Sequence, residues 1–164
     1  MKNNNLKFFQ LFYIINSIKF IFDSSKYKTP YLYETWTWEG DESVLPFKWV
    51  DLVRSSDLLK DKYNFDKTKL LLKEKYFSKK NFDKKSFFFI TYRSECSGCC
   101  YMDTNNNNKI DYFLVNNKHK EKKVEYGLFN LIYNRAKELN INKIYIDLNL
   151  TNINENFFEE IGFK

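Results

Sequence analysis

The sequence has few of the residues on which several classes of protein depend. Its 164 residues include four glycines, two prolines, three cysteines and one histidine. The cysteines, Cys96, Cys99 and Cys100, form one odd-numbered cluster, which excludes a disulfide framework and indicates a reducing compartment. A structural zinc site needs a full set of nitrogen and sulfur ligands, and this chain offers no second cysteine pair and only His119. We therefore expect the cysteines to be buried in a strand.

Long runs of like charge and long uninterrupted apolar runs are also missing. The net charge is +6, but the lysines alternate with acids, which favours a solvated surface over a nucleic-acid-binding one. The apolar stretch 6–22 is interrupted by five polar residues, so it does not make a clean membrane span. No small-residue cleavage site follows it. We expect residues 1–30 to pack on the domain, with no membrane partner and a cytoplasmic location.

What remains is an ordered series of strand and helix patterns. Strands are predicted over residues 31–38, 87–92, 99–103, 110–115 and 141–150. Helices are predicted over residues 47–63, 65–80, 124–140 and 154–162. A turn is expected at residues 94–98, between two of the strands. The last third reads as a β-α-β unit, so the sequence predicts an α/β or α+β domain over residues 31–164 with a mixed sheet.

The second half carries a more specific pattern. Val115 ends a strand, residues 120–125 form a polar turn, and a helix with Ala136 late in it follows. A strand and the sequence "FFEEIGF" at 157–163 come next. This arrangement resembles the GNAT N-acetyltransferase superfamily. The resemblance implies a largely antiparallel central sheet with helices on both sides, and a β-α-β unit that binds acetyl-coenzyme A.

The resemblance also implies a cofactor site. In this family acetyl-coenzyme A lies between two parallel strands that diverge, so the backbone of Leu114 and Val115 would hold its pantetheine arm. The following helix would point its N-terminus at the pyrophosphate. Asn152 lies near the position of a frequent family asparagine, although Thr151 is an alternative match. The implied cofactor-binding residues are Leu114, Val115, Lys120, Lys122, Lys123, Val124, Glu125, Tyr126 and Asn152.

The turn departs from the family pattern in a way that bears on binding. Lys123 and Glu125 replace two motif glycines, which would let the backbone approach a phosphate. Glu125 suits the positive end of a free helix but would compete with the pyrophosphate. The lysines of the turn offset that charge in sign. An alternative is that the turn is a connector that binds nothing.

Two further residues concern the chemistry. Many family members carry, at the position of Phe158, a tyrosine that protonates the leaving thiolate. Water would be the acid here. The alternative is that Phe158 only packs in the core. Asp111 is the predicted base because it shares the alternation of Val115 along the strand, the alternative being a solvated aspartate. Acids and tryptophans within residues 34–42 could hold an amine, or could form an edge strand and an acidic turn.

The function implied by the resemblance is transfer of an acetyl group from acetyl-coenzyme A to an amine of a small molecule or protein. The alternative is a catalytically inactive protein of the same fold that binds coenzyme A or another protein. Nucleic acid is not expected as a partner. The family continues through a further strand, whereas this sequence stops at Lys164. We therefore expect the last strand to be missing, which would leave a sheet edge for a second copy to pair with.

Overall fold

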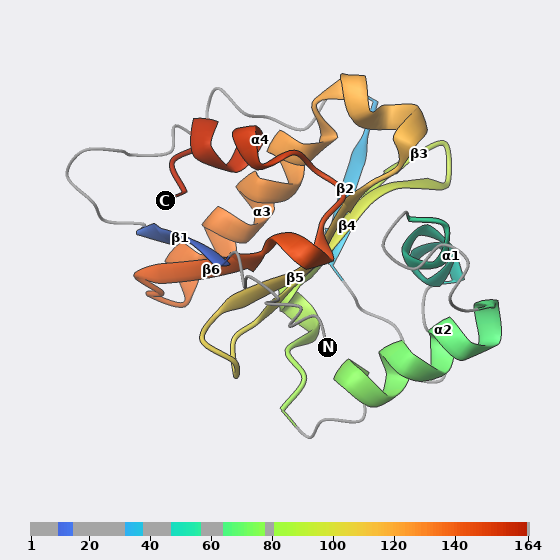
Figure 1. Ribbon diagram of the computed structural model, residues 1–164, viewed down its shortest axis with the longest axis horizontal. Helices are drawn as coiled ribbons and strands as arrows, with labels where there is room; N and C mark the ends of the chain where they lie inside the picture. Colours follow the sequence, from blue (N-terminus) through green and yellow to red (C-terminus); the bar gives the residue numbers. More distant parts are fainter. Residues whose placement is uncertain (1–9, 15–31, 38–46, 57–63, 78–80, 164) are drawn as a thin grey trace, which may run out of the picture.

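The computed structural model describes residues 10–14, 32–37, 47–56, 64–77 and 81–163 (Figure 1). In these residues one mixed, mostly antiparallel sheet has the strand order β1-β6-β5-β4-β3-β2. Its strands are β1 (Gln10–Ile14), β2 (Glu34–Thr37), β3 (Phe87–Tyr92), β4 (Glu95–Asp103), β5 (Lys109–Val115) and β6 (Lys143–Asp147). The helices are α1 (Phe47–Ser55), α2 (Phe65–Leu72), α3 (Val124–Glu138) and α4 (Glu155–Glu160). The α+β class predicted from the sequence is confirmed.

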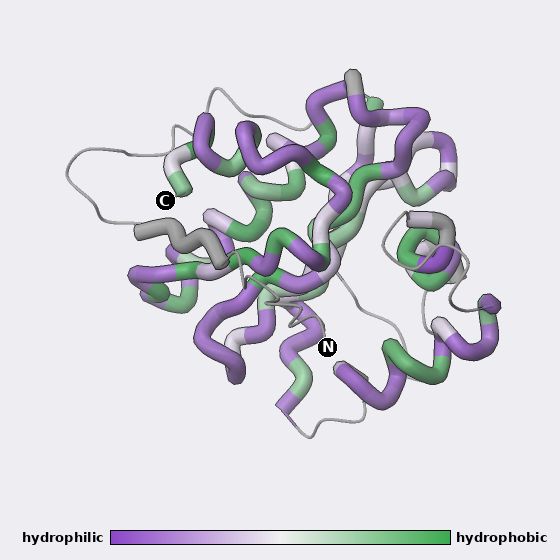
Figure 2. Tube along the Cα trace, in the orientation of Figure 1, coloured by the Kyte–Doolittle hydropathy of each residue, from purple (hydrophilic) through white to green (hydrophobic). Residues whose placement is uncertain are grey.

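Helical layers cover both faces of the sheet. Helices α3 and α4 lie on one side, and α1 and α2 lie on the other (Figure 1). Strand β3 serves both layers because successive side chains of a strand point to opposite faces. Phe88 and Ile90 join the core beneath α3, whereas Phe87 and Phe89 pack with Trp49 of α1. The hydrophobic residues accordingly follow the central strands in Figure 2, while the turn before α3 is mostly hydrophilic.

Strands β5 and β6 form the parallel pair of the sheet and are connected through α3. They pair at Lys109↔Tyr145 and Ile110↔Ile146, after which β6 ends in the 3₁₀ turn η4 (Leu148–Leu150). Farther along, one isolated parallel bridge, Phe113↔Thr151, joins β5 to the segment that follows β6. The predicted β-α-β unit is therefore present, and the regular pairing of its two strands is interrupted beyond Ile110, where only the bridge Phe113↔Thr151 follows.

A β-bulge changes the direction of side chains along β5. Cys99 pairs with Leu114 and Tyr101 pairs with Asp111, so β5 carries one more residue than β4 between these pairs. Tyr112 accommodates the extra residue with a left-handed backbone, at a φ of 51°. Beyond the bulge the alternation is reversed, and residues on either side of it that share parity in the sequence face opposite layers.

Gly98 lies inside β4 and not in the turn that was expected over residues 94–98. The turn consists of Arg93 and Ser94, both with positive φ, and β4 begins at Glu95. A Cβ atom at Gly98 would lie 2.9 Å from both Leu128 Cδ1 and Val124 Cγ1 of α3. Glycine is therefore needed because α3 packs closely on β4. The cysteines of this strand are buried and free, as predicted.

The outer edge of β6 is covered. Strand β1 pairs antiparallel with it, from Gln10↔Asp147 to Ile14↔Lys143. The expectation that this edge would be exposed to a second copy is wrong, because part of the N-terminal apolar segment forms the neighbouring strand. Within the described residues, none of the helices has both the length and the apolar character that crossing a bilayer requires.

Candidate functional site

The opening between β5 and the chain after β6 is bridged by side chains. Thr151 Oγ1 donates a hydrogen bond to the Phe113 carbonyl at 2.7 Å. The Val115 N–H donates to Asn152 Oδ1 at 3.0 Å, and Asn152 Nδ2 donates to the Val115 carbonyl at 2.7 Å. Both residues proposed for the family asparagine position therefore contact β5, Thr151 at Phe113 and Asn152 at Val115. The backbone groups of Val115, expected to be available to a ligand, are paired with Asn152.

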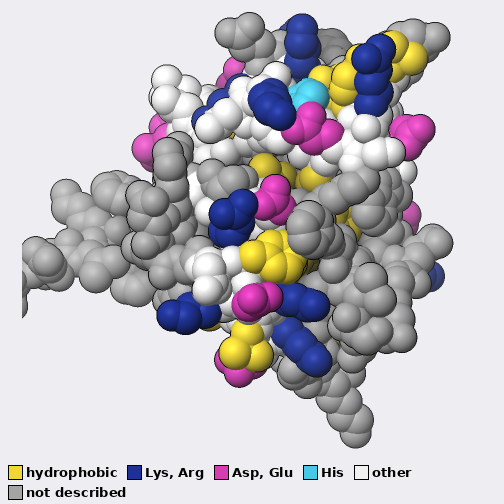
Figure 3. Space-filling model, turned by 90° about the vertical axis from the view of Figure 1, so that its right-hand side faces the viewer, with side chains coloured by type: hydrophobic (Ala, Val, Ile, Leu, Met, Phe, Trp, Pro, Cys, Tyr) yellow, Lys and Arg dark blue, Asp and Glu magenta, His cyan; other side chains and the backbone are white. Residues whose placement is uncertain are grey.

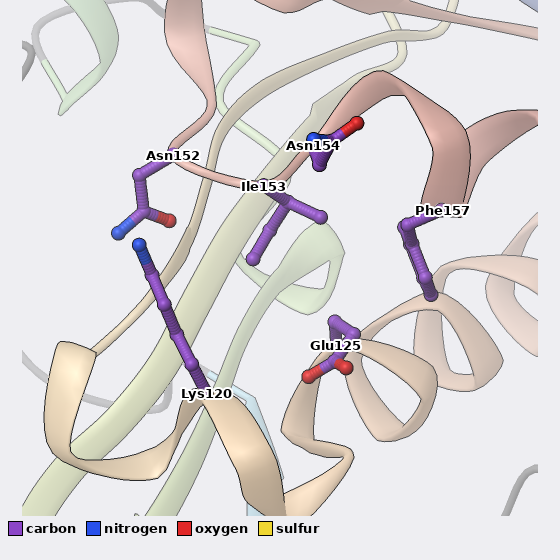
Figure 4. Close-up of a pocket in the computed structure, with 6 residues that line it drawn as sticks. All are labelled: Lys120, Glu125, Asn152, Ile153, Asn154 and Phe157. Atoms are coloured by element: carbon purple, nitrogen blue, oxygen red, sulfur yellow. The ribbon is translucent and has the colours of Figure 1, made fainter.

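Two cavities meet at Asn152. The larger has a volume of about 530 Å³, and the smaller, about 330 Å³, lies beside Val115. Figure 4 shows the larger cavity, with the Lys120 side chain extending toward that of Asn152. The larger cavity is lined by Lys120, Glu125, Asn152, Ile153, Asn154 and Phe157. The smaller cavity is lined by Asp51, Leu52, Ser56, Glu95, Val115, Asn116, Asn117, Lys118 and Asn152.

The turn before α3 forms one wall of the larger cavity. It is the 3₁₀ turn η3 (Asn117–Lys122), which Asn116 caps by accepting a hydrogen bond from the Lys118 N–H. Lys123 then adopts a left-handed conformation, with φ 58° and ψ 30°, and α3 begins at Val124. Lys123 supplies no side-chain cap, so it leaves the first backbone N–H groups of α3 without that partner.

The predicted cofactor residues other than Val115 have different surroundings. Lys120, Glu125 and Asn152 line the larger cavity, while Lys122 and Lys123 are exposed on the turn. Leu114 and Val124 are fully buried in the two core layers. The Tyr126 hydroxyl donates a hydrogen bond to Glu160 at 2.9 Å, and its ring packs edge-on against Phe157 at 5.0 Å. The lysine that lines the cavity is thus Lys120.

Glu125 brings a negative charge to the start of α3. Burial raises the pKa of its carboxyl group, and repulsion from Glu160 acts in the same direction. The backbone of α3 and Lys123 oppose this shift. A carboxylate whose charged form is destabilised accepts a proton more readily as the pH falls. The expected competition between Glu125 and a bound phosphate therefore weakens in mildly acidic solution.

A hydrogen-bonded chain stands beside the smaller cavity. Glu95, the first residue of β4, accepts a hydrogen bond from Lys118 Nζ at 3.0 Å and lies 3.4 Å from His119 Nε2. His119 is buried, and its Nδ1 lies 2.9 Å from the Tyr33 hydroxyl. A carboxylate only accepts hydrogen bonds, so in neutral His119 the proton belongs on Nε2 and Tyr33 donates to Nδ1.

In this hydrogen-bonded series of side chains, Glu95 is the acid that solvent can reach. Its side chain keeps 41% of its exposure, whereas that of His119 keeps 9%. The hydrogen bond from Lys118 is the main reason why the pKa of Glu95 is lowered, and His119 adds to this effect. No sequence pattern singles out Glu95, because the expected turn at 94–98 places it outside a strand. Tyr33 and His119 were missed because their contacts join distant parts of the chain.

Asp111, predicted as the base, lies elsewhere. It is buried, accepts a hydrogen bond from the Tyr76 hydroxyl at 2.8 Å, and pairs with Lys75 at 3.4 Å and Lys109 at 3.5 Å. It lines neither cavity. The prediction assumed regular alternation between Asp111 and Val115, and the bulge at Tyr112 breaks that alternation. The structure therefore does not bring Asp111 to the opening.

Phe158 is fully buried and takes the core-packing alternative considered for it. Its ring packs against those of Phe113 at 5.5 Å, Phe157 at 5.0 Å and Phe163 at 5.6 Å. The segment 34–42, expected to recognise an acceptor, lies outside the described residues from position 38 onward. Of its described part, Glu34 is exposed on the edge strand β2.

Charges of both signs are mixed on the described surface. On the face shown in Figure 3, lysine and arginine side chains stand among acidic ones, and the histidine lies beside both kinds. This distribution agrees with the expectation of a solvated, lysine-rich surface. No model of a known protein family matches the chain, and a search of the curated proteins finds no match either.

Proposed function

We propose that the protein is an acyl-coenzyme A-dependent N-acyltransferase of the GNAT type, which transfers an acetyl group to an amine. The observation that carries the proposal is the interrupted pairing of the parallel strands β5 and β6, next to two cavities that share Asn152 as a lining residue. The arrangement agrees with what the sequence resemblance implies. A β-α-β order alone would name no function.

The residues where the two cavities share Asn152, with Val115 in the smaller cavity and Lys120 in the larger, fit an anionic ligand that carries an amide. Val115 already pairs through its N–H and carbonyl with a carboxamide, that of Asn152, so its backbone is able to bind an amide group. Lys120 supplies a positive charge, and the first N–H groups of α3 favour a phosphate. These groups would hold the pantetheine arm and the pyrophosphate of acetyl-coenzyme A, which supplies an activated acyl thioester.

The smaller cavity fits the acceptor. Glu95 lines it and is backed by His119, so we propose that Glu95 takes the proton that the attacking amine must lose. The amine nitrogen forms a bond to the acyl carbon as the carbon–sulfur bond breaks. Phe158 has no acidic proton, so the thiolate takes its proton from water, and the hydroxide left behind is neutralised by the proton that Glu95 took up. Glu95 thereby replaces Asp111 as the candidate base.

The alternative is a protein of this fold that binds coenzyme A without transferring an acyl group. Three observations favour it: Glu125 lines the proposed phosphate site, Phe158 replaces the usual acid, and the lowered pKa of Glu95 makes it a weaker base. The alternative shares the cofactor site with the first proposal and differs in turnover. Binding and turnover must therefore be measured separately.

Thermal melting in the presence of acetyl-coenzyme A tests the shared part of both proposals. Ligand at a hundredfold over Kd adds about 2.7 kcal/mol to the free energy of unfolding. For a chain of this size that corresponds to a Tm increase of roughly 5–10 °C. Lys120→Ala should reduce the shift, and Lys69→Ala, an exposed lysine of α2, serves as the matched control. An unchanged Tm at millimolar ligand would overturn the proposed function.

Release of free thiol then separates the transferase from the binding protein. The assay uses a panel of small primary amines at saturating acetyl-coenzyme A. Amine-dependent thiol release supports the transferase, and Glu95→Gln should slow it while leaving the ligand-induced Tm shift intact. Binding without release for any amine would favour the non-catalytic alternative.

A further inference from the structure

The hydrogen bonds of Asn152 occupy the two backbone groups of Val115, at which the proposed function places a ligand amide. A carboxamide has a donor and an acceptor, and Asn152 uses both on the two backbone groups of Val115. An amide within an extended ligand offers the same pair of groups. We propose that the Asn152 side chain is a displaceable plug, which leaves Val115 when the ligand binds. This inference rests on the proposed function, because it concerns the ligand proposed to bind at Val115 and Lys120.

The position of Asn152 gives the plug a second consequence. Asn152 is the residue that lines both cavities, so its side chain stands between them. Its movement away from Val115 would connect the larger cavity, with Lys120, to the smaller cavity, with Glu95. Displacement by the ligand would thus open the path between the acyl donor and the acceptor at the same time.

The chain around Asn152 allows the side chain to move while the backbone stays in place. On one side, Thr151 is held to β5 by the bond from its hydroxyl to the Phe113 carbonyl. On the other, the Ile153 N–H donates to Thr151 Oγ1 at 3.1 Å, and Asn154 caps α4 through the Asn156 N–H at 2.9 Å. A change of rotamer at Asn152 is therefore sufficient, and Figure 4 shows the cavity into which it can turn.

The plug and a direct ligand contact predict opposite effects of the same substitution. If Asn152 competes with the ligand, Asn152→Ala removes the competitor, and acetyl-coenzyme A should bind about tenfold more tightly, as expected for two hydrogen bonds that no longer have to be broken. If Asn152 instead contacts the ligand, the same change weakens binding. Asn149→Ala is the matched control, since Asn149 is exposed and its amide contacts Asp147.

Titration calorimetry with acetyl-coenzyme A decides between these outcomes. Tighter binding by Asn152→Ala, or binding by that variant alone, supports the plug. Weaker or equal binding beside a wild type that binds would overturn the plug and leave the proposed function intact. No binding by either protein at millimolar ligand would overturn the proposed function, and the plug with it.

Hydrogen exchange at the Val115 amide supplies a readout that does not depend on affinity. In the free protein, Asn152→Ala should expose this amide to exchange, whereas Asn149→Ala should not. Ligand should restore its protection in Asn152→Ala, because the ligand amide takes the place of Asn152. Exchange at Val115 that stays fast with ligand bound would overturn the plug. Asn152→Ser, too short to span to Val115, repeats both measurements if the alanine variant folds poorly.

Discussion

Lys123 makes a sharp prediction because it holds a backbone conformation that suits glycine. Its φ of 58° places it in the left-handed region, where a residue with a Cβ atom is destabilised by about 1–2 kcal/mol. The side chain is exposed and makes no capping bond, so little is lost when it is removed. Lys123→Gly should therefore stabilise the protein, although glycine is usually a destabilising substitution.

The expected magnitude follows from two opposing contributions. Glycine removes the left-handed strain, but it adds about 0.5–1 kcal/mol of conformational entropy to the unfolded chain. The net gain is about 0.5–1 kcal/mol, which corresponds to a Tm increase of roughly 1–4 °C at this chain length. Lys122→Gly is the matched control, because Lys122 is equally exposed but belongs to η3 and has a negative φ. The control should lose about 0.5–1 kcal/mol.

Chemical denaturation of the wild type and the two variants measures these changes directly. The midpoint should rise for Lys123→Gly and fall for Lys122→Gly, with the denaturant dependence unchanged. If both variants lost stability to the same extent, Lys123 would not be left-handed in solution. The reasoning about the backbone of the turn before α3 would then fail.

Further predictions concern substitutions at three single side chains. Glu125→Gln should bind acetyl-coenzyme A about fivefold more tightly, since roughly 1 kcal/mol of repulsion between unit charges is removed. Because the pKa of Glu125 is raised from 4.5, wild-type stability should fall as the pH rises from 4.5 through the raised value, and urea titrations of Glu125→Gln should lack this decrease. Phe158→Tyr should lower the free energy of unfolding by about 1–3 kcal/mol, because the added hydroxyl is buried among phenyl rings. It should not speed thiol release, and a faster release would show that the hydroxyl reaches the site. Asp111→Asn should lower stability by about 1–2 kcal/mol, as its partly exposed lysine partners lose their carboxylate, and should leave turnover of the folded protein unchanged; slower turnover would restore Asp111 as the base.

The parts of the fold that were predicted correctly rest on local patterns. Strand β3 was predicted at its observed bounds, and α3 within two residues of its end, because their apolar residues recur at strand and helix spacing. The parallel pairing of β5 and β6 followed from the order of elements alone. By contrast, β1 pairs with a strand far along the chain, and no local pattern indicates its partner.

The errors at the candidate site have a common physical origin. Gly98 was read as a turn residue, although glycine is needed there so that α3 can approach β4. The bulge at Tyr112 contains no glycine, so nothing in the sequence marks the reversal that turns Asp111 away from the opening. Both cases depend on contacts between separate elements. Local residue preferences predict such contacts poorly, which is why the alternation along the sequence points to Asp111 and the structure points to Glu95.

The scarcity of glycine in this chain therefore excludes less than the sequence suggests. A glycine-poor turn between a strand and a helix argues against phosphate binding only if its backbone cannot take the required shape. Lys123 takes a left-handed conformation at the start of α3, and the strain involved is small compared with the stability of a folded domain. The side chain that opposes an anion is Glu125, and the pKa of its carboxyl group is already raised by burial. If the proposed function holds, we therefore expect phosphate binding at this turn to depend more on the charge of Glu125 than on the two glycines that the resemblance implies.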